Sequence, residues 1–130
     1  MLQWLQALAT PVSWQAINII LLEEQDQDKL KHLVAAVDIV IVPSLSEWFG
    51  CVVSEVSTLW KPLVTTSVSA IPEAASGMLR FIPPAHTQAI VDGVVNAWQK
   101  KGGEHIPPKT FDWNESTKQL EKLYEWLMNH

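Results

Sequence analysis

Short apolar runs recur along the chain at strand length. They lie at residues 17–22, 38–42, 63–66 and 78–82, and Pro43 and Pro83 each end one of them. A continuous apolar run of this length, bounded by turn residues, is typical of a buried strand. The pattern therefore predicts about four strands.

Helical spacing of apolar residues appears between and beyond these runs. A short helix is predicted over residues 2–8, and Asp26 or Asp28 can cap the next one. Further helices are predicted from Gly50 to about Leu59, over residues 72–75, from Thr87, and from a cap at Asn114. The three clearest apolar faces comprise Leu30, Leu33, Val34 and Val37; Ile90, Val91, Val94, Val95 and Trp98; and Leu120, Leu123, Tyr124 and Leu127. Residues 100–108 are predicted to be a loop.

Strands that alternate with helices predict an α/β fold. Its sheet should be parallel and Rossmann-like, with about four strands flanked by helices and right-handed crossovers. At 130 residues the chain is at most one domain.

The chain is organised around residues 38–55, DIVIVPSLSEWFGCVVSE. A predicted strand ends at Pro43, a polar loop follows, and an apolar segment begins after Phe49-Gly50. In a parallel α/β sheet, ligands bind outside the carboxyl ends of the strands. Gly50 allows close approach of the backbone, and the free N–H groups at the start of the next helix favour an anion such as phosphate.

Two carboxylates, Glu47 and Glu55, bracket this predicted site. Carboxylates would repel a phosphate, so they are better suited to uncharged hydroxyl groups. A nucleotide sugar carries both hydroxyls and phosphates and fits this arrangement.

These residues resemble the conserved pattern of glycosyltransferase family 4. The resemblance rests on Pro43-Ser44, on Glu47 and Glu55 with seven residues between them, on Phe49-Gly50, and on residues 61–64, KPLV. It extends from about Ile17 to the end through Ile71-Pro72-Glu73, residues 79–84 and Phe111-Asp112-Trp113. It implies the GT-B architecture and a nucleotide-sugar donor.

The resemblance also implies roles for particular residues. Glu47 would contact the donor sugar and act as the catalytic residue, and Glu55 would hold the ribose. Donor contacts are expected from Trp48, Phe49, Gly50, Cys51, Val52 and Glu55. No metal and no cofactor are expected.

The chain departs from the family pattern in three respects. Trp60 and Ser69-Ala70 stand where the family usually has glycine, and we expect the turn at Trp60 to be built differently because tryptophan does not readily adopt a left-handed conformation. Relative to the family, we expect the chain to lack the first two strands of the donor domain, with their Arg and Lys, and the whole acceptor domain. We therefore expect residues 1–130 to be the second half of a C-terminal donor-binding domain, incomplete relative to a full GT-B domain. A companion chain or self-association would supply the missing strands.

Composition limits the other possibilities. The net charge of −5 and the lack of a basic cluster argue against a nucleic-acid partner. Cys51 is the single cysteine, which excludes an intrachain disulfide, and its expected role is that of a small buried side chain. No stretch of 18 apolar residues exists to span a membrane, and we expect a cytoplasmic protein.

Three interpretations remain open. The first is a donor-binding half of a retaining glycosyltransferase, which transfers sugar from a nucleoside diphosphate to an acceptor hydroxyl and is inactive alone. The second is a non-catalytic interaction subunit or remnant with the same fold. The third is an unrelated Rossmann-like binding domain in which Glu47 and Glu55 are incidental.

Overall fold

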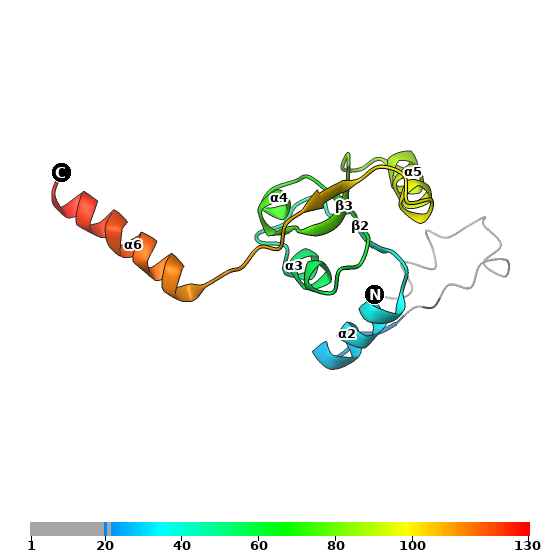
Figure 1. The fold of residues 1–130 in the computed structure, drawn as a ribbon, viewed down its shortest axis with the longest axis horizontal. Coiled ribbons are helices and arrows are strands. Elements are labelled where there is room, and N and C mark those ends of the chain that lie inside the picture. Colours follow the sequence, from blue (N-terminus) through cyan, green and yellow to red (C-terminus); the bar gives the residue numbers. More distant parts are fainter. Residues whose placement is uncertain (1–19, 21) are drawn as a thin grey trace. The chain divides into compact units, whose positions relative to one another are not determined.

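The computed structural model describes residue 20 and residues 22–130. Figure 1 traces their helices and strands along the chain. In order, these are α2 (Gln27–Ala36), β1 (Val40–Val42), α3 (Cys51–Thr58), β2 (Leu63–Thr66), α4 (Ile71–Ala74), β3 (Gly77–Ile82), α5 (Thr87–Trp98), β4 (Glu104–Ile106) and α6 (Trp113–Met128). The chain divides into two units, residues 1–30 and 31–130, and the sheet lies in the second. The helix predicted over residues 2–8 lies outside the described residues.

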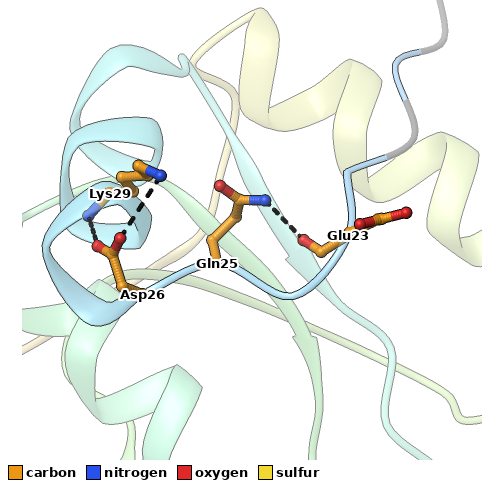
Figure 2. A network of polar contacts seen from close by, with 4 residues as sticks. All are labelled: Glu23, Gln25, Asp26 and Lys29. Atoms are coloured by element: carbon orange, nitrogen blue, oxygen red, sulfur yellow. Dashed lines mark hydrogen bonds and ion pairs between the residues drawn. The ribbon is translucent and has the colours of Figure 1, made fainter.

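The start of α2 belongs to the first unit. The Asp26 carboxylate accepts a hydrogen bond from the Lys29 backbone N–H at 2.8 Å and forms an ion pair with its Nζ at 3.6 Å. Gln25 donates to the Glu23 carbonyl at 2.8 Å in the same turn (Figure 2). Asp26 therefore caps α2, as one of the two predicted alternatives.

The sheet has four strands in the order β1-β2-β3-β4. The first three strands are parallel, with Val42 opposite Thr65 and Thr66 opposite Ile82. β4 is antiparallel to β3 and pairs Ile106 with Gly77. The predicted α/β, Rossmann-like sheet flanked by helices is thus confirmed, and it is mostly parallel.

The fourth strand is not the one predicted. Residues 104–106 form β4 where a loop was expected, because a three-residue edge strand of mainly polar residues carries no apolar run. Most of the predicted strand at residues 17–22 lies outside the described part of the chain. Its described residues, Ile20 and Leu22, are exposed and have no regular structure.

The two helices α3 and α5 cover opposite faces of the sheet. Val53 and Val56 of α3 form the buried core with Leu63, Ile71, Ala75 and Leu79. On α5, a Cβ placed at Gly93 would lie 2.9 Å from Val64 Cγ1, so the helix packs almost directly on the strand. Leu63 and Val64 are neighbours in β2, and successive strand residues point to opposite faces.

Two predicted helix ends differ from the structure. Trp60 does adopt a left-handed conformation, with φ of 54°, and its N–H donates to the Ser57 carbonyl after α3. The expectation of a differently built turn is therefore wrong. The cap of α6 is Asp112, which accepts from the Asn114 N–H at 2.8 Å, and not Asn114 as predicted.

Several apolar helix faces stay uncovered within the described residues. Val91, Val95 and Trp98 of α5 are about half exposed or more. The predicted face of α6, formed by Leu120, Leu123, Tyr124 and Leu127, is 47–57% exposed. None of the helices described is long and apolar enough to cross a bilayer.

Candidate functional site

The loop that follows β1 is held by the end of β2. Thr65 and Thr66, the last residues of β2, donate their hydroxyls to the Val42 carbonyl at 2.9 Å and to the Ser44 carbonyl at 2.6 Å. Both threonines are almost fully buried. Thr65 thus joins the ends of two neighbouring parallel strands, and Thr66 holds the first residues of the loop, at the edge where such sheets bind ligands.

Glu47 is half-buried in this loop. The Ser44 hydroxyl donates to Glu47 Oε1 at 2.9 Å, which ties the carboxylate to the start of the loop. Among the described residues, this is the hydrogen bond that the Glu47 side chain makes.

Gly50 leads the loop into α3. It is buried and left-handed, with φ of 82°, and its carbonyl accepts the Ser54 N–H at 3.0 Å. A side chain at this φ would be strained, which explains why glycine stands here. No side chain caps α3, so the first N–H groups of this eight-residue helix are available to an anion.

The other predicted donor-binding residues surround this helix start. Trp48 is 99% exposed, Val52 is 47% exposed, and Cys51 is also exposed, which contradicts the expectation of a buried thiol. Cys51 is the first residue of α3. In this first turn, the side chain that packs into the core is that of Val53 and not that of Cys51. Glu55 is exposed on the second turn of α3.

Phe49 meets the segment that returns after β4. Its ring contacts Phe111 edge-on, with centroids 5.0 Å apart. Lys109 on the same segment donates to the Pro72 carbonyl at 2.6 Å. Phe49 and Phe111 line a pocket of about 430 Å³ together with Asp112, Trp113 and Ser116.

Among the described residues, no cluster of three or more His, Cys, Asp or Glu side chains could hold a metal ion. The described groups around the start of α3 are one carboxylate held by a serine, exposed aromatic rings and the helix N-terminus.

Comparison with known families decides the relationship. Residues 2–100 match the family described as glycosyl transferases group 1. The chain belongs to this family. The relationship expected from Glu47, Phe49-Gly50 and Glu55, membership of glycosyltransferase family 4, is thereby confirmed.

One curated relative within the family is D-inositol 3-phosphate glycosyltransferase from Mycobacteroides abscessus. The two chains are 29% identical over an alignment of 120 positions, and this alignment covers 84% of this chain and 26% of the relative. The chain thus spans about a quarter of the length of this relative.

Thr66 holds the start of the site loop, a role that was not predicted from the sequence. Its only sequence signal is a pair of hydroxyl residues at the end of an otherwise apolar strand, Leu63-Val64-Thr65-Thr66. A hydroxyl in a buried strand requires an acceptor, and a residue at the strand end can find one in the neighbouring loop.

Proposed function

We propose that the chain is the nucleotide-sugar-binding part of a retaining glycosyltransferase of GT-B architecture. The observation that carries this proposal is the Glu47 carboxylate, held by Ser44 beside the uncapped N-terminus of α3. Membership of the group 1 family supports it. In this proposal residues 1–130 form part of a C-terminal donor-binding domain.

The proposed roles follow from charge. Glu47 accepts a hydrogen bond from a sugar hydroxyl, and Glu55 accepts one from the ribose. The acceptor oxygen attacks the anomeric carbon from the side of the phosphate and passes its proton to a phosphate oxygen, while the bond between that carbon and the bridging phosphate oxygen breaks. The phosphate leaves with the electron pair, and the N–H groups of Gly50, Cys51 and Val52 stabilise its developing charge. Trp48 and Phe49 line the path by which the nucleotide sugar reaches these groups.

In this proposal the chain alone holds the nucleotide sugar, whereas transfer also needs a further part of the protein or a companion chain. Within the described residues, β1 pairs on one side only, with β2. Residues 43–55 contain no Lys or Arg to neutralise a pyrophosphate. Self-association is the other means of covering the open edge of β1.

A second candidate function is a non-catalytic interaction subunit that keeps the fold. The absence of basic residues from 43–55 favours it, because two phosphates carry charge that helix dipoles compensate only in part.

A binding titration of the chain tests the proposal. The probes are UDP-glucose, GDP-mannose and ADP-glucose, followed by tryptophan fluorescence, with Trp48→Phe to identify the signal of Trp48. We expect saturable binding by one of them. Glu47→Ala and Glu55→Ala should each weaken it about tenfold, since each removes a charged hydrogen-bond acceptor.

Glu104→Ala is the matched control, because Glu104 is exposed on β4 and has no role in the proposed site. The affinity of Glu104→Ala for the nucleotide sugar should equal that of the parent. A folded chain that binds none of the probes would contradict a self-contained donor site. Equal binding of UDP and UDP-glucose, unaffected by Glu47→Ala, would instead indicate a nucleotide site in which Glu47 does not contact the sugar.

A further inference from the structure

The two threonines at the end of β2 are adjacent, yet their hydroxyls donate hydrogen bonds to different parts of the chain. Thr65 is 0% exposed and donates to Val42, a residue of β1 itself. Thr66 is 1% exposed and donates to Ser44, which lies beyond β1 in the site loop. Thr65 therefore fastens strand to strand, whereas Thr66 fastens strand to loop.

The end of β1 explains why a side chain is needed at this point. The Val40 N–H donates to the Pro62 carbonyl, so the even-numbered residues of β1 face β2, and the strand ends at Val42. The Thr66 hydroxyl supplies the next link, to Ser44 at 2.6 Å, two residues after Val42.

Packing alone does not account for a threonine here. Thr66 lies on the same face of the sheet as Val64, and a valine would fill the same volume without a buried hydroxyl. A buried hydroxyl is costly unless it is hydrogen-bonded. The bond to Ser44 is therefore the feature that distinguishes threonine from valine at this position.

Ser44 passes this restraint on to the carboxylate. Its carbonyl accepts from Thr66 and its hydroxyl donates to Glu47 Oε1 at 2.9 Å. A single residue thus joins the buried end of β2 to the acid of the site. If the Ser44 peptide shifts, its hydroxyl moves with it, and Glu47 loses its fixed partner.

We propose that Thr66 is a positioning residue for Glu47, acting through Ser44 without touching the ligand. This inference rests on the proposed function, because it concerns the sugar-facing role given to Glu47. We therefore predict that removal of the Thr66 hydroxyl weakens the affinity for the nucleotide sugar, whereas removal of the Thr65 hydroxyl leaves it unchanged.

Three variants of the whole chain separate the hydroxyl from its volume. Thr66→Val keeps the shape of the side chain but removes its hydroxyl. Thr66→Ser keeps a hydroxyl that can donate the hydrogen bond to Ser44. Thr65→Val removes an equally buried hydroxyl and is the control. The first measurement is hydrogen exchange of residues 44–50 without ligand. Thr66→Val should speed it several-fold, while Thr66→Ser and Thr65→Val should leave it near the parent rate.

The second measurement is affinity for the nucleotide sugar that the parent binds most tightly. We expect Thr66→Val to weaken binding about tenfold, through loss of the held Glu47 carboxylate. A double-mutant cycle with Glu47→Ala tests the route. Once Glu47 is absent, Thr66→Val should change the affinity less than twofold, because nothing remains for it to position.

The outcomes separate this inference from the proposed function. Equal losses for Thr65→Val and Thr66→Val, or an undiminished effect of Thr66→Val in the Glu47→Ala background, would overturn the positioning role. If the parent binds no nucleotide sugar, the proposed function fails. The hydrogen-exchange measurement then tests the link between Thr66 and the loop by itself. Unchanged exchange in residues 44–50 of Thr66→Val would overturn the link to the loop.

Discussion

At the scale of single residues, the backbone adopts a conformation that favours glycine at several positions that other residues occupy. Trp60, Ser69, Ala85 and Lys100 all have φ between 49° and 54°. The left-handed strain at Trp60 is offset by contacts such as its stacking on His105, with ring centroids 5.9 Å apart.

Lys100 gives the simplest test of that strain. It is the left-handed residue after α5, where its N–H donates to Ala97 and the N–H of Lys101 donates to Asn96. This is the helix ending that favours glycine. Lys100→Gly should therefore raise the free energy of unfolding by about 0.5–1 kcal/mol, measured by urea titration.

Lys101→Gly is the matched control for this change. Lys101 is the next residue, is also exposed, and is not among the residues with positive φ. Glycine there should give no gain in stability. Equal stabilisation by both changes would show that loss of positive charge, and not relief of strain, is responsible.

At the scale of elements, α6 depends on its own ends. All of its residues are exposed within the described structure, so tertiary contacts contribute little to its formation there. An isolated helix of 16 residues is marginal in water. Its N-cap therefore carries much of its stability.

Asp112→Ala should destabilise α6 by about 1 kcal/mol, because it removes the acceptor for the Asn114 N–H. The expected result is faster hydrogen exchange in the first turn of α6 and less helical signal in circular dichroism. Asn114→Ala is the control, and alanine inside the first turn should leave the helix intact or strengthen it. A larger loss from Asn114→Ala would restore Asn114 as the cap.

At the scale of the whole molecule, charge opposes the proposed ligand. The chain carries a net charge of −5, and a nucleotide sugar is anionic. Long-range repulsion should slow their encounter, and salt screens such repulsion over about 10 Å at 0.1 M.

Raising sodium chloride from about 20 to about 200 mM should therefore strengthen nucleotide-sugar binding or leave it unchanged, measured by titration at constant pH. The uncharged nucleoside is the control and should show no dependence on salt. A marked weakening with salt would indicate that cations of the chain hold the phosphates, against the proposed use of backbone N–H groups.

The sheet and its helices were predictable where an apolar run had the length of its element. β2 occupies residues 63–66 as predicted, and α5 starts at Thr87. β4 was missed because Glu104-His105-Ile106 has no such run, and its strand conformation comes from pairing with Gly77–Leu79. Cys51 was expected to be buried, yet the direction of α3 exposes it.

The family and the order of most elements could be predicted from the sequence, which also suggested the residues of the proposed site. These depend on local spacing: apolar runs, helical periodicity, and the pattern that joins Glu47, Phe49-Gly50 and Glu55. Tertiary structure alone decided that Thr66 reaches Ser44 and that Phe111 meets Phe49. These contacts join residues 22 or more positions apart, and their side chains meet only because strand pairing and chain return bring them together.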